Sequence, residues 1–160
     1  MIILGISAYY HDSSACIVKD GVLTAAAQEE RFNRIKNCSD FPIQAINFCI
    51  QQSGISFADI DYIAFYEQPY IKFHRILLDY IEKFPFSYPA FLKNIPYWLQ
   101  DRLIIPIIIK KELGYTGKIL FVPHHYSHAA STFFLSPFEE SGIITADGVG
   151  EFATTCIGAG

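Results

Sequence analysis

Short apolar runs separated by turn residues open the chain. Three runs rich in Ile, Val and Ala cover residues 2–7, 14–19 and 22–28. Asp20 and Gly21 lie between the second and third runs, and this dipeptide is a strong hairpin signal. The pattern predicts a three-stranded antiparallel meander in which residues 8–13 form the first turn.

A helical pattern follows the meander. Apolar residues recur at helical spacing from Ile43, with Asp40 as the expected cap and Gly54 as the expected stop. Residues 70–113 are also helical in pattern, but four prolines are predicted to break this region into several pieces. Its most apolar stretch is far shorter than the roughly 20 residues that a membrane span needs.

Further strands are predicted at residues 60–66, 118–122, 142–147 and 152–158. A helix from residue 123 to about residue 134 separates the second of these strands from the third. This order predicts an α/β fold of the ribonuclease-H-like type, a mixed β-sheet flanked by helices. A lone hairpin at residues 139–160 is marginal in water, so either it packs on the first domain or it begins a second lobe that this sequence does not complete. We expect the second arrangement, with residues 1–138 as the first lobe.

Composition narrows the classes of function. Hydrophobic residues make up 51% of the 160 positions, which is enough for a domain with a real core. A net charge of -4 with scattered Lys and Arg argues against a nucleic-acid surface and against a polybasic membrane anchor. The four cysteines show no CxxC spacing, which indicates reduced thiols and a cytoplasmic protein.

A histidine cluster carries the candidate chemistry. His124 and His128 stand four positions apart just after Pro123, so a helix would present both imidazoles on one face. Neutral imidazole is the commonest metal ligand, and a helix amino terminus disfavours the imidazolium form. Chance clustering of histidines at a helix start is the alternative. His125 points about 100° away on a helix, so we expect it to hydrogen-bond a substrate or phosphate instead.

Asp147 is the expected third ligand. It ends an apolar strand and enters a glycine turn, the place where ligands usually bind in open α/β sheets. With His124 and His128 it makes a two-His, one-carboxylate set, which suits Fe(II) and is compatible with Zn or Mn. The alternative is that Asp147 only accepts hydrogen bonds within its Asp-Gly turn.

The first turn is a candidate site for a phosphate or sugar. The hydroxyls of Ser13 and Ser14, with neighbouring backbone amides, can cradle such a group. His11 and Asp12 offer a donor and an acceptor toward a transferred group. An ordinary polar loop is the alternative.

The second turn repeats this arrangement between two predicted strands. It supplies Gly148, Gly150 and Glu151 as candidate cofactor-binding residues, and the two hairpins resemble the paired phosphate loops of actin-like ATPases. The charged residues 29–31 follow the third strand, where they either orient a loop over the site or form a solvated cluster.

Four sequence blocks occur in one order along nearly the whole chain. They are Gly5-Ile6-Ser7 with His11-Asp12-Ser13-Ser14-Ala15, then Gln28-Glu29-Glu30-Arg31-Phe32, then His124-His125-Tyr126-Ser127-His128-Ala129-Ala130, then Asp147-Gly148-Val149-Gly150-Glu151. Together they resemble the O-carbamoyltransferases of natural-product and nodulation-factor biosynthesis. The first domain of that family belongs to the actin-like ATPase superfamily and is akin to the enzyme that installs threonylcarbamoyl-adenosine in tRNA.

The resemblance implies a two-stage reaction. Carbamoyl phosphate and ATP give a carbamoyl-adenylate in a separate domain, and the actin-like domain passes the carbamoyl group to a hydroxyl of a small-molecule acceptor. By resemblance, His124, His128 and Asp147 are metal ligands, joined by a carboxylate from outside this sequence, and the metal holds the adenylate phosphate. His11 and Asp12 are by resemblance catalytic residues on the acceptor or carbamoyl side.

The departure from the family is length. The second half of this domain and the adenylate-forming domain are missing from the 160 residues, so we expect no complete turnover from this chain alone. Two other functions stay open. A relative of the tRNA threonylcarbamoyl transferase is one, which the acidic charge argues against. A lobe that only docks a partner is the other, favoured by any exposed aromatic face at Tyr88, Phe91, Tyr97 and Trp98.

Overall fold

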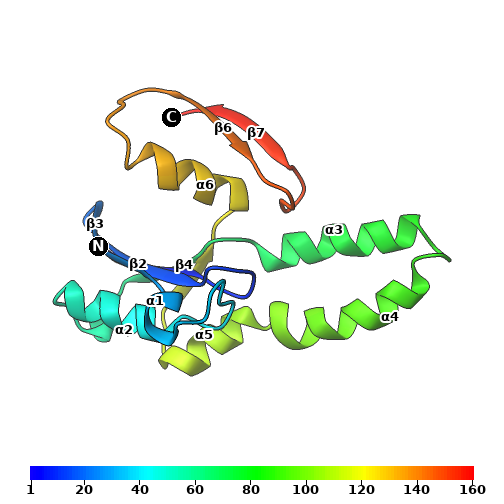
Figure 1. Cartoon of the computed structure of the whole chain (residues 1–160), viewed down its shortest axis with the longest axis horizontal. Helices are drawn as coiled ribbons and strands as arrows, with labels where there is room; N and C mark the ends of the chain where they lie inside the picture. Colours follow the sequence, from blue (N-terminus) through cyan, green and yellow to red (C-terminus); the bar gives the residue numbers. More distant parts are fainter. The chain divides into compact units, whose positions relative to one another are not determined.

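The computed structural model describes residues 1–160, and the chain divides into two compact units. Unit 1 comprises Met1–Tyr66 with Thr116–Leu120, and unit 2 comprises Glu67–Tyr115 with Phe121–Gly160. A five-stranded sheet belongs to unit 1 and a two-stranded sheet to unit 2 (Figure 1). The chain is therefore an α/β protein, as predicted.

The sheet of unit 1 is mixed. Its strands are β1 (Ile2–Ser7), β2 (Ser14–Lys19), β3 (Val22–Gln28), β4 (Tyr62–Phe65) and β5 (Lys118–Phe121). They lie in the order β3-β2-β1-β4-β5. The first three strands pair antiparallel, and β4 pairs parallel to β1. The predicted meander is confirmed, with Asp20 and Gly21 both at positive φ in its second turn.

One face of this sheet forms the core of unit 1. Alternate positions are buried along the strands, as the pleat requires, and the buried set includes Leu4, Ile17, Ile63 and Phe65. Helix α2 (Ile43–Gln52) packs on β2 and β3 through its own buried side of Ala45, Ile46 and Cys49. Gly54, at positive φ just beyond the helix, ends it as predicted.

The cap of α2 differs from the prediction. Asp40 is exposed and does not occupy the cap position. Pro42 occupies it, and its side chain makes no hydrogen bond to the first turn of the helix. The buried carboxylate of Glu29 accepts hydrogen bonds from the backbone N–H groups of Gln44 at 3.3 Å and Ala45 at 2.8 Å. Glu29 thus stabilises the helix start from the end of β3, and it is not part of a solvated cluster.

Two short elements connect the strands of unit 1. They are α1 (Glu30–Asn33) and the 3₁₀ turn η1 (Phe57–Asp59). In η1, Ser56 and Asp59 form a capping box. Beside α1, the side chain of Arg31 is 67% exposed and pairs with Glu30, whose side chain is 19% exposed and also accepts from the backbone N–H of Asn37.

The proline-rich region of unit 2 forms separate helices, as predicted. They are α3 (Pro69–Glu82), α4 (Tyr88–Tyr97), the π-helical turn η2 (Trp98–Arg102) and α5 (Ile105–Leu113). Pro89 and Pro106 lie in the first turns of α4 and α5, where a missing N–H costs nothing. Pro96 lies inside α4, and the π-helical turn follows it directly.

Helices α3 and α4 run side by side as a helical hairpin (Figure 1). Asn94 of α4 donates to the hydroxyl of Tyr80 on α3 at 2.8 Å, and the rings of Tyr80 and Phe91 meet edge to face. None of the helices is both long and apolar enough to cross a membrane.

The last part of unit 2 is a helix followed by a hairpin. Helix α6 (His124–Phe133) contacts β6 (Gly142–Ala146), which pairs antiparallel with β7 (Thr155–Ala159). The final strand begins three residues later than the sequence predicts. Residues 152–154 belong to the turn instead, because the carbonyls of Ala153 and Thr154 bond to His125 and to the backbone of Asp147.

Candidate metal centre

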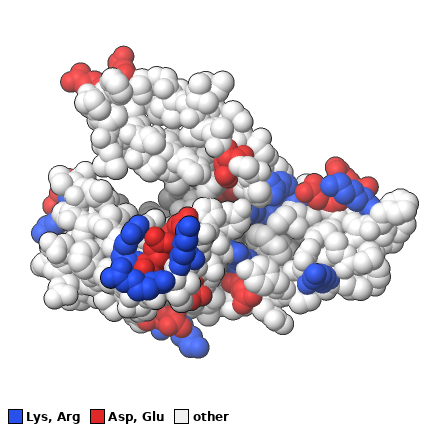
Figure 2. Space-filling view, in the orientation of Figure 1, with Lys and Arg blue, Asp and Glu red and all other residues white.

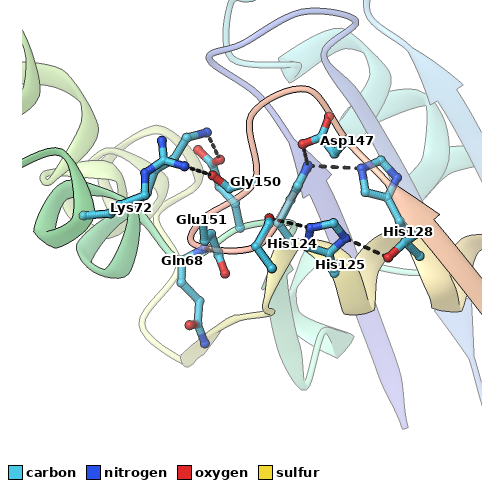
Figure 3. Close-up of polar contacts among 12 residues, drawn as sticks. Gln68, Lys72, His124, His125, His128, Asp147, Gly150 and Glu151 are labelled. Carbon is cyan, nitrogen blue, oxygen red and sulfur yellow. Dashed lines mark hydrogen bonds and ion pairs between the residues drawn. The ribbon is translucent and has the colours of Figure 1, made fainter. Parts of the chain in front are cut away.

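Helix α6 presents two imidazoles on one face. It begins at His124, directly after Pro123, and His128 follows one turn later. The Nε2 atoms of the two rings are 3.1 Å apart. Two lone-pair donors therefore lie close together at the start of the helix, as the spacing of four predicts (Figure 3).

Asp147 brings a carboxylate to the same place. It follows β6 directly, and its Oδ2 is 3.0 Å from Nε2 of His124. One ligand atom from each of His124, His128 and Asp147 lies within 4.8 Å of the others. Ligand bonds of about 2.0–2.2 Å put two donors of one ion no more than about 4.4 Å apart. The three residues thus fit one divalent ion after a closure of a few tenths of an ångström.

The surroundings favour the ligating forms of two of these groups, His128 and Asp147. Burial, followed by the charge of His124, holds the pKa of His128 below its usual value, which favours the neutral ring. Burial would raise the pKa of Asp147, but the charge of His124 and a hydrogen bond from Gly148 outweigh it. The pKa of Asp147 therefore lies below its usual value, and this side chain is a carboxylate at neutral pH.

His125 points away from this cluster into the protein. Its Nε2 donates to the carbonyl of Ala153 at 2.7 Å, because a carbonyl can only accept. In the neutral ring Nδ1 is then the acceptor, so the hydroxyl of Thr145 donates to it at 2.7 Å. The ring is buried. Both nitrogens are occupied by the chain itself, and the expected bond to a substrate or phosphate stays a prediction.

The turn between β6 and β7 is held against α3 as well (Figure 3). Arg75 donates through Nη1 to the carbonyl of Gly150 at 2.7 Å. The buried carboxylate of Glu151 accepts from the backbone N–H of Gln68, at the start of α3. At Gly150 an added Cβ would lie 1.8 Å from the carbonyl oxygen of Ala153, so only glycine fits. Gly148 has open space around it.

The predicted catalytic pair lies in unit 1. Nδ1 of His11 and Oδ2 of Asp12 are 2.6 Å apart, and both side chains are exposed, His11 by 59% and Asp12 by 40%. Asp12 has a φ of 53°, in the left-handed region that aspartate tolerates better than most residues. The turn thus brings together the donor and acceptor that the sequence predicted there.

The two serines after this pair differ in exposure. Ser13 is fully buried, its backbone N–H donates to the carbonyl of Cys38, and its Oγ makes no hydrogen bond. Ser14 is half-buried and begins β2. Their part in binding a phosphate stays a prediction.

Comparison with known proteins identifies the family. The profile of the carbamoyltransferase N-terminus family matches residues 2–159. The chain belongs to this family. The resemblance expected from the four sequence blocks is confirmed.

Three relatives are similar to this chain, and the chain covers a different share of each. The chain is 48% identical over 166 residues to "Uncharacterized protein sll1178" of Synechocystis sp., covering 99% of the chain and 27% of that relative. It is 35% identical over 157 residues to "Nodulation protein NolNO" of Sinorhizobium fredii, covering 95% of the chain and 22% of that relative. It is 42% identical over 60 residues to an uncharacterized 19.2 kDa protein of Rhizobium etli, and the match covers 38% of the chain and 35% of that relative. The chain thus spans about a quarter of the length of the first two relatives.

Sequence reasoning missed the residues that hold the turn of this carbamoyltransferase domain. Arg75 lies in the amphipathic helix α3 and Gln68 precedes its first residue, and the sequence pattern marks neither as special. Thr145 reads as an ordinary strand residue, and Ala153 contributes only its backbone. No local signal in the sequence identifies these four positions, because each acts through a contact distant in the chain.

Proposed function

We propose that this chain is the amino-terminal portion of a carbamoyltransferase acting on a hydroxyl of a small-molecule acceptor. The donor is carbamoyl-adenylate, made from carbamoyl phosphate and ATP by a part of the protein outside these residues. His124, His128 and Asp147 hold a divalent ion, for which Fe(II) is the first choice and Zn or Mn the next. Membership of the carbamoyltransferase N-terminus family supports the reaction class.

The observation that carries the proposal is the convergence of three ligand atoms from two elements. Two imidazoles of α6 and the carboxylate after β6 come within 4.8 Å although they are up to 23 positions apart. A two-His, one-carboxylate set leaves coordination positions open for a substrate. A divalent ion held by these residues would bind the adenylate phosphate and would stabilise the negative charge that develops on it.

His11 and Asp12, in the first turn, form the proposed general base. With Nδ1–H of His11 donating to Asp12, Nε2 keeps its lone pair and takes the proton of the acceptor hydroxyl. The acceptor oxygen bonds to the carbamoyl carbon, and the bond from that carbon to the phosphate oxygen breaks. AMP leaves with the electron pair. Asp12 orients the ring and stabilises the imidazolium that forms.

The order of the sheet supports the proposed fold family. A three-stranded antiparallel meander followed by a strand parallel to β1 matches the ribonuclease-H-like arrangement that the actin-like ATPases use. In that family residues 1–138 are the first lobe and residues 139–160 begin the second. By resemblance to that family, Ser13 and Ser14 in unit 1 are candidate contacts for ATP or carbamoyl-adenylate. Gly148, Gly150 and Glu151 in unit 2 are candidates on the same ground.

The tRNA threonylcarbamoyl transferase alternative lacks charge support. The net charge is -4, and the face shown in Figure 2 has its Lys and Arg in small groups beside Asp and Glu. A protein that binds RNA gains most of its affinity from a continuous basic surface. A small-molecule acceptor is therefore the better proposal.

A second candidate, a lobe that docks a partner without catalysis, has one observation in its favour. The tip of the α3–α4 hairpin exposes Ile81 by 70%, Phe84 by 68% and Phe86 by 91%. Large apolar side chains exposed close together in the chain are a candidate interaction surface. Of the aromatic face expected from the sequence, Tyr88 and Tyr97 are exposed, whereas Phe91 and Trp98 are half-buried.

Metal analysis of the purified chain tests the proposed centre. The chain has five histidines, which allows a matched pair of double variants. His124→Ala with His128→Ala removes two proposed ligands, and His11→Ala with His74→Ala removes two histidines elsewhere. After incubation with Fe(II), Zn(II) or Mn(II) and removal of free ion, we expect about one ion per chain in the wild type and in the second variant.

The two variants separate the candidate functions. We expect the His124/His128 double variant to retain little or no metal. Equal metal content in all three proteins would refute the metal centre and favour the docking lobe. Loss of metal in both double variants would mean that histidines bind the ion without the proposed geometry.

A further inference from the structure

We propose that His125 is a positioning residue: it fastens the β6–β7 hairpin to α6 so that Asp147 faces His124 and His128. This inference rests on the proposed metal centre and assigns its middle histidine a task. His125 does not touch the ion. It acts on the strand and turn that carry the third ligand.

The contacts of His125 reach both legs of the hairpin. Thr145, bonded to Nδ1 of His125, lies two residues before Asp147 on β6. Ala153, bonded to Nε2 of His125, lies on the returning leg. Between them the backbone N–H of Asp147 donates to the carbonyl of Thr154 at 2.8 Å. One buried ring therefore holds the two legs on either side of the carboxylate.

Helix geometry directs the side chains of His124 and His125 to different partners. Successive side chains leave an α-helix about 100° apart, so His124 can face Asp147 while His125 faces the hairpin legs. Figure 3 shows the two imidazoles directed to these different partners. A shift of the hairpin would move Asp147 away from Nε2 of His124, now 3.0 Å from it.

Packing around the turn leaves little room for another arrangement. A Cβ at position 150 would lie 3.0 Å from Nε2 of His125 as well as 1.8 Å from the carbonyl oxygen of Ala153. The bond from Arg75 to the carbonyl of Gly150 holds the far side of the same turn. The ring of His125 is therefore closely packed and held in one conformation. A residue that positions a metal ligand needs such a fixed conformation.

The test compares His125→Phe with His125→Gln and with Tyr126→Phe. Phe keeps the ring but removes both hydrogen bonds, Gln keeps an N–H that reaches toward the carbonyl of Ala153, and Tyr126 is 70% exposed on the same helix. Two quantities are measured: amide hydrogen exchange at Asp147 in the metal-free chain, and the affinity and visible spectrum of bound Co(II).

We expect His125→Phe to speed exchange at Asp147 and to weaken Co(II) binding about 10- to 100-fold, the usual effect of losing an outer-shell partner. Its Co(II) spectrum should match that of Asp147→Ala, because both lose the carboxylate. His125→Gln should lie between His125→Phe and the wild type, and Tyr126→Phe should equal the wild type.

Each other outcome has a definite meaning. Unchanged exchange at Asp147, or a Co(II) affinity within twofold of the wild type, overturns the positioning role. If the wild type binds no Co(II), the proposed metal centre fails, and exchange alone decides whether His125 fastens the hairpin. Should His125→Phe fail to fold, Thr145→Val removes one of the two bonds with little change of shape and is measured in the same way.

Discussion

Two histidines of α6, His125 and His128, have different electrostatic surroundings. His128 stands beside another imidazole and a carboxylate, whereas His125 is enclosed by a hydroxyl and a backbone carbonyl. Burial and the neighbouring charge of His124 keep the pKa of His128 low, so protons compete weakly for its lone pair near neutral pH.

Metal binding should therefore weaken with acid in a defined way. The histidines must be neutral to bind, and the pKa of His128 lies below its usual 6.5. The pKa of Asp147 lies below 3.8, so this ligand stays charged throughout. We expect a constant Co(II) affinity above about pH 7 and a progressive loss below about pH 6. Titration calorimetry at stepped pH measures this, and an affinity unchanged down to pH 4.5 contradicts it.

A single buried carboxylate, Glu29, should contribute measurably to the stability of unit 1. Glu29→Gln keeps the size of the side chain but removes the charge that accepts from Gln44 and Ala45. We expect a loss of about 1–3 kcal/mol in the free energy of unfolding by urea, the usual range for charge-assisted bonds. Asp40→Asn is the control and should change it by no more than about 0.5 kcal/mol. Equal midpoints for the two variants would show that Glu29 does not cap α2.

At the scale of elements, the turn between β6 and β7 joins the candidate site to two helices. His125 of α6 and Arg75 of α3 both bond to its backbone, and Glu151 returns a bond to the start of α3. The hairpin is short, and a two-stranded sheet is marginal by itself. Its stability must come largely from these contacts.

The two glycines of this turn should respond differently to substitution. Gly150→Ala places a Cβ against the carbonyl of Ala153, whereas Gly148→Ala meets nothing within 4 Å. We expect Gly150→Ala to destabilise by about 1–3 kcal/mol, as overpacking does, and Gly148→Ala to stay within about 0.5 kcal/mol. Thermal unfolding followed by circular dichroism compares them. A destabilised Gly148→Ala with an unaffected Gly150→Ala would contradict the close packing seen here.

At the scale of the whole molecule, this chain corresponds to a fraction of its relatives. It covers 27% and 22% of the two relatives that match it along nearly its full length. By resemblance to the family, the proposed reaction also needs a donor-forming site and a further carboxylate ligand from outside these residues. Binding and turnover are therefore separable properties.

We expect the 160-residue chain to bind the metal but not to transfer a carbamoyl group. A protein of the relatives' length that carries this segment should catalyse the transfer from carbamoyl phosphate and ATP to a hydroxyl. Removing His124 and His128 there should lower kcat/KM by about 100-fold or more, since an ion supplies several kcal/mol. The transfer is measured with radiolabelled carbamoyl phosphate. Comparable transfer rates from the 160-residue chain and the longer protein would disprove the claim that the short chain binds metal without turnover.

Local pattern determined much of this protein. Short apolar runs identified the strands, and Asp20 with Gly21 located the second turn of the meander. The spacing of four placed His124 and His128 on one face of α6. These features depend on periodicity and on backbone preferences that neighbouring residues carry, so the sequence alone predicts them.

Only the tertiary structure decided which distant groups meet. Glu29 caps a helix that begins 14 positions later, and local signals pointed to Asp40 instead. His125 bonds to residues 20 and 28 positions away, Thr145 and Ala153. A buried polar atom needs a hydrogen-bond partner, and the packing of whole helices and strands determines which atom lies within reach. No periodic pattern records that choice.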